Sequence, residues 1–94
     1  MSRITILGCT GSIGESTLDV IARHPDRFQV HALVARSSVD RVFEQCVRFR
    51  PRMAVLTSVE AAHELALRVR EAGLPIDVLA GPDAAVDAAC ASEV

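Results

Sequence analysis

The chain alternates short apolar runs with longer segments in which apolar residues recur every three or four positions. The short runs predict strands over residues 3–7, 28–35, 53–56 and 76–79. The longer segments predict helices over about 14–23, 39–49 and 57–72, followed by an alanine-rich helix over about 81–91. Strands that alternate with helices of this length form β-α-β units, so we expect a parallel sheet with right-handed crossovers.

The segment 39–49 has the clearest amphipathic pattern. Its apolar positions are Val39, Val42, Phe43, Cys46 and Val47, which form one stripe at helical spacing. Ser37 or Ser38 is the expected N-cap of this helix. Thr57 with Glu60 predicts a capping box at the start of the next helix, and Gly73 a left-handed residue just after its end.

Composition narrows the class of protein. The 94 residues are 50% hydrophobic, which suits one small globular domain, and the net charge of −2 argues against nucleic-acid binding. No apolar stretch is long enough to span a bilayer. Cys9, Cys46 and Cys90 lack the spacing of a zinc site or a disulfide framework. A cytoplasmic protein without nucleic-acid or membrane partners is the expectation.

The stretch GCTGSIG joins the first predicted strand to the first predicted helix. A glycine-rich loop at the carboxyl end of a strand suits an anion, because the N–H groups at a helix N-terminus carry partial positive charge. The predicted diphosphate-binding residues are Gly8, Thr10, Gly11, Ser12, Ile13 and Gly14. The G-x-x-G-x-x-G spacing lacks the Lys-Ser/Thr pair of a P-loop, and a turn without any ligand is the alternative.

Arg36, Ser37 and Ser38 follow the second predicted strand, where dinucleotide-binding proteins contact the ribose. An acidic residue there favours NAD, whereas arginine accommodates the 2′-phosphate of NADP. We therefore predict NADPH rather than NADH. The alternative is that Arg36 is a solvated loop residue and the two serines only cap a helix.

No residue of the chain is predicted to be catalytic or to bind metal. His24, His31 and His63 have no cysteine, aspartate or glutamate at the spacing of a metal site or a catalytic triad. Structural roles are the expectation for all three.

The run ITILGCTGSIGESTLDVIARHPDRFQVHALVA, with later matches at 44–46, 50–55 and 78–81, resembles the start of the 1-deoxy-D-xylulose 5-phosphate reductoisomerase family. The resemblance spans essentially all 94 residues and rests most specifically on T-G-S-I-G-x-x-T-L-D-V. It implies that Thr10, Gly11, Ser12 and Ile13 bind the diphosphate of NADPH. Arg36-Ser37-Ser38 stands where the family has a basic triplet such as G-K-N, and Cys9 replaces the usual serine.

The resemblance also implies a function. The family enzyme rearranges 1-deoxy-D-xylulose 5-phosphate and reduces it with NADPH in non-mevalonate isoprenoid synthesis, using Mg²⁺ or Mn²⁺ and acting as a homodimer. Residues 1–94 would be the N-terminal portion of its NADPH-binding Rossmann-like domain, with the catalytic and C-terminal domains absent. The fragment alone would be inactive, and metal and substrate would bind only in the full-length enzyme.

Family chains continue into a strand that pairs with the first strand. We therefore expect an incomplete nucleotide-binding domain of about four strands and four helices, in which the fourth strand extends the sheet beyond the third. The first strand would then form an exposed edge, and cofactor binding by the fragment would be weak. Two other functions remain open: another NADP-dependent dehydrogenase or epimerase, and a nucleotide-sensing module without catalysis.

Overall fold

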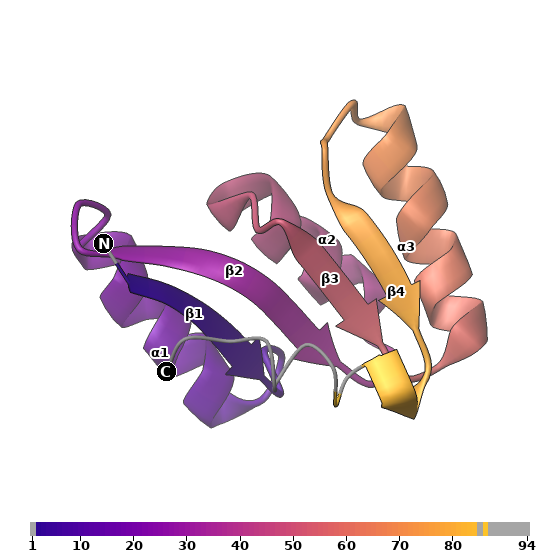
Figure 1. Ribbon diagram of the computed structural model, residues 1–94, viewed down its shortest axis with the longest axis horizontal. Helices are drawn as coiled ribbons and strands as arrows, with labels where there is room; N and C mark the ends of the chain where they lie inside the picture. The colour runs from indigo at the N-terminus through magenta and orange to yellow at the C-terminus, as the bar shows by residue number, and fades with distance from the viewer. Residues whose placement is uncertain (1, 85, 87–94) are drawn as a thin grey trace.

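Four parallel strands form a sheet in the order β1-β2-β3-β4 (Figure 1). The computed structural model describes residues 2–84 and 86. The strands are β1 (Ser2–Leu7), β2 (Phe28–Ala35), β3 (Met53–Leu56) and β4 (Asp77–Ala80). The helices are α1 (Ser12–Arg23), α2 (Val39–Phe49) and α3 (Val59–Glu71). The predicted α/β class and Rossmann-like parallel sheet are confirmed.

The three helices lie on one face of the sheet (Figure 1). All strands run in the same direction, so the loops that follow them meet at one edge. Among the described residues, β4 extends the sheet beyond β3 and β1 is an outer strand, as expected. The carboxyl edge therefore brings the loops after β1 and β2 together on adjacent strands, about 4.8 Å apart.

The main core lies between the sheet and the helices. Its fully buried members include Leu33 and Leu56 from the strands and Val42 and Leu65 from the helices. On the opposite face, a smaller cluster contains Ala32, Val34 and Val55, with Met53 and Ala84 packed against it. Strand β2 thus contributes to both clusters, which explains its nearly continuous apolar sequence.

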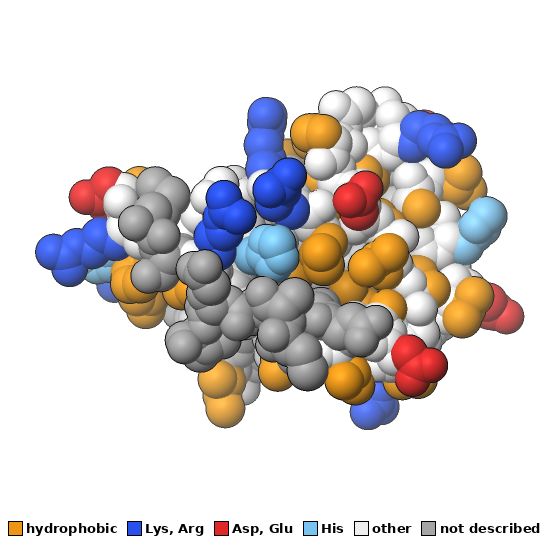
Figure 2. All heavy atoms as spheres, in the orientation of Figure 1, with side chains coloured by type: hydrophobic (Ala, Val, Ile, Leu, Met, Phe, Trp, Pro, Cys, Tyr) orange, Lys and Arg blue, Asp and Glu red, His pale blue; other side chains and the backbone are white. Residues whose placement is uncertain are grey.

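The face of the sheet away from the helices also exposes hydrophobic side chains (Figure 2). Leu7 and Leu79 alternate with inward-facing neighbours and are 60% and 39% exposed. The described part of the chain therefore covers one face of the sheet much more completely than the other.

The ends of several elements differ from the prediction. Helix α1 begins at Ser12 instead of Gly14, because Gly11 already occupies the N-cap position with an extended backbone. Strand β4 begins at Asp77, because the N–H of Ile76 donates to the Leu74 carbonyl in a turn. The fourth predicted helix is seen at residues 82–84 and 86, and its continuation to about residue 91 lies outside the described residues.

The predicted capping box at the start of α3 is wrong. Thr57 directly follows β3, and its N–H still donates to the Ala35 carbonyl of β2 at 3.1 Å. Ser58 is the N-cap, and its hydroxyl accepts a hydrogen bond from the Ala61 N–H. Gly73 ends the helix in the left-handed region with φ of +71°, as predicted.

The predicted stripe of α2 is correct except at its end. Val39, Val42 and Cys46 are buried and Phe43 is half-buried, whereas Val47 is 47% exposed. Val47 follows Cys46 directly, so the helical turn of 100° per residue carries its side chain away from the sheet. Ser38 is the N-cap residue, although its side chain makes no capping hydrogen bond.

The two N-cap serines allow a matched test of capping. Ser58→Ala is expected to lower the free energy of unfolding by about 0.5–1 kcal/mol, because the Ala61 N–H loses its acceptor. Ser38→Ala removes no capping bond and is expected to change stability by only a few tenths of a kcal/mol. Urea denaturation followed by circular dichroism measures both. Equal losses would show that the Ser58 bond does not stabilise α3.

Candidate functional site

A tight turn connects β1 to α1. Gly8 has φ of +67°, a left-handed conformation that favours glycine. Its carbonyl accepts a hydrogen bond from the Gly11 N–H at 2.9 Å, which closes the turn. The Cys9 N–H donates to the Val34 carbonyl at 3.0 Å and continues the hydrogen bonding to β2 past the end of β1. The loop is therefore anchored to the sheet on both sides of Gly8.

Gly14 lies in the first turn of α1, directly against this loop. A Cβ at this position would fall on the Gly8 carbonyl oxygen and lie 2.8 Å from the Cys9 Cα. Only glycine lets the helix approach the strand so closely. The third glycine of the predicted motif is thus required by packing.

The N-terminus of α1 presents N–H groups that no residue within 2–84 or 86 accepts. Ser12, Ile13 and Gly14 are its first three residues, and such N–H groups have no acceptor within a helix. No described side chain caps this end. Ser12 is exposed, Thr10 is half-buried, and the Ile13 side chain is 84% exposed. These positions provide N–H and hydroxyl donors beside the positive end of the helix dipole.

Arg36, Ser37 and Ser38 form the next loop on the same edge of the sheet. They follow β2, whose Val34 pairs with Leu7 at the end of β1. All three residues are exposed, and Arg36 forms no ion pair with any residue in the described part of the chain. The Arg36 carbonyl accepts the Ser58 N–H at 3.0 Å, so the backbone is fixed while the guanidinium is available.

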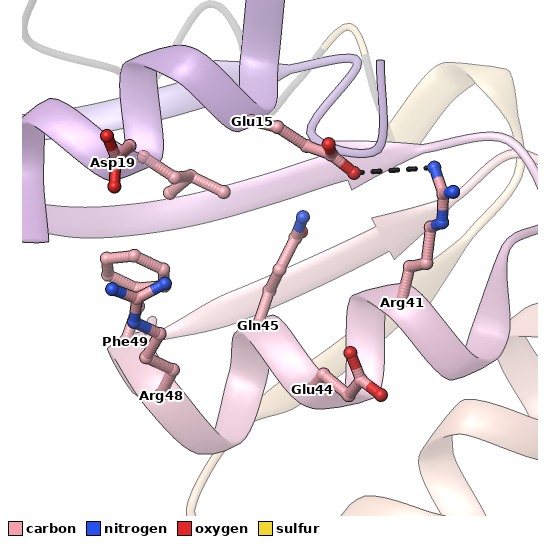
Figure 3. Close-up of a pocket in the computed structure, with 8 residues that line it drawn as sticks. Glu15, Asp19, Arg41, Glu44, Gln45, Arg48 and Phe49 are labelled. Atoms are coloured by element: carbon pink, nitrogen blue, oxygen red, sulfur yellow. Dashed lines mark hydrogen bonds and ion pairs between the residues drawn. The ribbon is translucent and has the colours of Figure 1, made fainter. Parts of the chain in front are cut away.

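Two side chains of α2 contact the glycine loop, and neither is among the site residues predicted from the sequence. Gln45 donates from Nε2 to the Cys9 carbonyl at 2.7 Å. Arg41 donates from Nη1 to the Thr10 carbonyl at 3.2 Å and lies 3.3 Å from Glu15 Oε1 (Figure 3). In the sequence, Arg41 and Gln45 stand out only as polar residues four positions apart beside an apolar stripe. The sequence does not show which groups they bind.

A groove of about 340 Å³ separates α1 from α2 behind the loop (Figure 3). Glu15 and Asp19 line it from α1, and Arg41, Gln45 and Arg48 from α2. Its charges are mixed, whereas the helix N-terminus and Arg36 are both positive in character. The carboxyl edge of the sheet is therefore the better place for an anion.

The two cysteines of the described residues are free and fully buried. Burial, together with a smaller contribution from the nearby Cys46, raises the pKa of the Cys9 thiol to about 12. Burial alone raises the pKa of Cys46 to about 12. Both therefore remain protonated at neutral pH and act as small apolar residues. Cys90 lies outside the described residues.

Within residues 2–84 and 86, no three histidine, cysteine, aspartate or glutamate side chains lie close enough to hold a metal ion. The helices of this part are also too short or too polar to cross a membrane. The described residues thus provide groups that can bind an anion but no cluster of side chains that could bind a metal ion.

The fold and this edge define a Rossmann-like α/β protein with a glycine-rich loop between its first strand and first helix. A sequence model of the 1-deoxy-D-xylulose 5-phosphate reductoisomerase family matches residues 4–94. The chain therefore belongs to the 1-deoxy-D-xylulose 5-phosphate reductoisomerase family. This membership excludes the alternative of another dehydrogenase or epimerase family.

Curated relatives carry the same family name. The enzyme of Aromatoleum aromaticum is 57% identical over 89 residues, which are 95% of this chain and 22% of the relative. That of Cupriavidus metallidurans is 60% identical over 84 residues, or 89% of this chain and 21% of the relative. The chain thus spans about a fifth of the length of these relatives.

Solved structures agree with the fold. The reductoisomerase from Zymomonas mobilis in complex with NADPH has a TM-score of 0.87 and 40% identity, covering 94% of this chain and 23% of that one. A reductoisomerase in complex with NADPH, fosmidomycin and magnesium has a TM-score of 0.89 and 36% identity, covering 95% and 22%. The match therefore extends over nearly the whole chain.

Proposed function

We propose that this chain forms the diphosphate and 2′-phosphate parts of an NADPH site. The proposed contacts are Gly8, Thr10, Gly11, Ser12, Ile13, Gly14, Arg36, Ser37 and Ser38. The main support is the N-terminus of α1 next to the glycine turn, which no side chain in the described part of the chain caps. Its N–H groups suit the charge of a diphosphate, and Gly11 keeps side-chain atoms away from the backbone there.

The similarity to an NADPH complex supports the same ligand. The Zymomonas mobilis reductoisomerase in complex with NADPH matches 94% of this chain. In this chain, Arg36 can form charge-assisted hydrogen bonds to a 2′-phosphate, and the N–H groups at the start of α2 can add to them. The exposed Ile13 side chain offers an apolar contact to the remainder of the nucleotide.

The complete protein is proposed to be an NADPH-dependent reductoisomerase. It would rearrange and reduce 1-deoxy-D-xylulose 5-phosphate, as the names of the relatives suggest. The product that the family resemblance implies is 2-C-methyl-D-erythritol 4-phosphate. NADPH would supply the hydride, and residues 1–94 would form the N-terminal portion of the cofactor domain. The substrate and a divalent metal such as Mg²⁺ would bind outside this segment. The catalytic groups would also lie outside it.

Two further properties belong to the same proposal. The complete protein is expected to be a homodimer in the cytoplasm. The free, fully buried thiols of Cys9 and Cys46 are consistent with a reducing compartment.

A chimera tests the proposed activity. Residues 1–94 replace the matching segment of the Aromatoleum aromaticum relative, and oxidation of NADPH is followed with 1-deoxy-D-xylulose 5-phosphate and Mg²⁺. We expect oxidation that requires substrate and is faster with NADPH than with NADH. A folded chimera that binds NADPH but does not oxidise it would favour the nucleotide-sensing alternative, and one that binds no NADPH would contradict the proposal.

The cofactor preference is tested at Arg36. Arg36→Gln is expected to weaken NADPH binding by about 10- to 100-fold and to leave NADH binding unchanged, since only NADPH carries the 2′-phosphate. Isothermal titration of the chimera measures both affinities. Arg23→Gln, an exposed arginine at the opposite end of α1, is the matched control. Equal weakening of NADH and NADPH would remove Arg36 from the 2′-phosphate site.

A further inference from the structure

The carbonyl groups of the glycine loop are all engaged within the protein. Four consecutive residues, 8 to 11, each use the carbonyl as an acceptor. The pairs are Gly8 with the Gly11 N–H at 2.9 Å, Cys9 with Gln45 Nε2 at 2.7 Å, Thr10 with Arg41 Nη1 at 3.2 Å, and Gly11 with the Glu15 N–H at 2.9 Å. Two of the four donors are side chains of α2.

The direction of these carbonyls matters for an anion site. A carbonyl oxygen carries partial negative charge and would repel a phosphate, whereas an N–H group attracts it. Peptide planes are rigid, so a bond that holds a carbonyl inward also fixes the direction of the next N–H. A loop held in this way does not have to reorganise when the anion binds.

Gln45 holds the loop carbonyl of Cys9 but places a polar group beside the core. Its side chain is half-buried between α1 and α2 beside the apolar stripe (Figure 3). Its Oε1 is buried and has no partner among the described residues. A leucine or methionine would fill similar space without an unpaired oxygen. Compared with these apolar residues, the Gln45 amide contributes one hydrogen bond, to the Cys9 carbonyl.

Arg41 combines two effects at the same loop. Its guanidinium bonds the Thr10 carbonyl and pairs with Glu15, the acidic residue in the first turn of α1. An unpaired carboxylate there would add negative charge beside the proposed diphosphate position. The ion pair offsets that charge while the hydrogen bond fixes the loop.

We infer that Gln45 and Arg41 are positioning residues, which hold the glycine loop in the orientation that receives the diphosphate. The inference rests on the proposed NADPH site for its consequence in binding. Its structural part, the ordering of residues 8–14, concerns this chain without any ligand. The two parts can therefore fail separately.

The structural part is tested without ligand. Amide hydrogen exchange and ¹⁵N relaxation are measured by NMR for the 94-residue chain carrying Gln45→Leu or the more flexible Gln45→Met. We expect faster exchange and larger amplitudes at residues 9–12 in both variants, with β2 and α3 unchanged. Gln29→Leu, the same change at an exposed strand position, is the control. A loop as ordered as in the unsubstituted chain would overturn the inference.

The functional part compares two ligands on the chimera. Gln45→Met is expected to weaken NADPH about tenfold, roughly the effect of one lost hydrogen bond, and to leave 2′-AMP, which lacks the diphosphate, unchanged. Equal weakening of both ligands would indicate general damage and contradict a positioning role. Failure of the unsubstituted chimera to bind NADPH would instead contradict the proposed function, while the ligand-free NMR result would still decide whether Gln45 orders the loop.

Arg41 is tested by a double-mutant cycle with Glu15. Arg41→Gln is expected to raise the KM for NADPH and leave kcat and the KM for 1-deoxy-D-xylulose 5-phosphate unchanged. Adding Glu15→Gln should recover part of the loss, because the exposed negative charge is then removed. Loss of kcat with an unchanged KM for NADPH, or no recovery in the double variant, would contradict the assignment.

Discussion

Gly14→Ala is expected to lower the free energy of unfolding by about 3 kcal/mol or more, enough to unfold much of a small domain. The added methyl group would fall on the Gly8 carbonyl and lie 2.9 Å from its carbon, so the obstacle is backbone and not a flexible side chain. Relief requires α1 to move away from β1, which opens the core around Leu18 and Ile21. Urea denaturation or the melting temperature measures the loss.

Gly11→Ala is the matched control for this prediction. It makes the same change three residues earlier, where φ is −82° and the new Cβ would lie 3.3 Å from the Gly8 carbonyl oxygen. A shift of a few tenths of an ångström relieves that contact, so we expect a loss of less than about 1 kcal/mol. Similar stabilities for the two variants would show that α1 does not require glycine at position 14.

Alkaline pH is expected to destabilise the chain through Cys9 and Cys46. Their pKa values are raised from 9.0 to about 12 in the fold, so the folded state holds its thiol protons more tightly than the unfolded state. This stabilisation is complete below pH 9 and is lost as pH rises toward 12. The slope would reach about 1.4 kcal/mol per pH unit for each thiol.

The amino-acid composition removes other titrating side chains from this measurement. The sequence contains neither lysine nor tyrosine, the other side chains that titrate between pH 9 and 12. Urea denaturation at several pH values in a Cys90→Ser background gives the dependence. Cys9→Ala with Cys46→Ala should flatten it, despite lower stability from lost packing. An unchanged slope in this variant would show that the buried thiols are not its source.

The sequence predicted the elements whose hydrophobic pattern reflects their burial in the sheet. The apolar run of β2 arises from burial on both faces, and its observed bounds match the prediction. Gly14 shows the packing role that a glycine at this spacing has in Rossmann-like loops, because α1 and the loop after β1 approach too closely there for a Cβ. The position of β4 beyond β3 was expected because family chains continue into a strand that pairs with the first strand.

Other features depend on tertiary contacts that local pattern does not contain. Ser58 caps α3 instead of Thr57, because Thr57 remains paired to β2 by its N–H. Gln45 and Arg41 lie beside the apolar stripe of an amphipathic helix, and only the packing of α2 beside the glycine loop reveals their acceptors. Such side-chain bonds join residues more than thirty positions apart.

The proposed cofactor loop is tested most directly by NADPH titration of the ¹⁵N-labelled 94-residue chain, followed by amide chemical shifts. We expect shifts at residues 11–14 and 36–38 at millimolar NADPH, with the second group responding to 2′-AMP but not to NADH. A folded chain whose shifts lie elsewhere, or that shows none at the glycine loop, would contradict the claim that this loop receives the diphosphate.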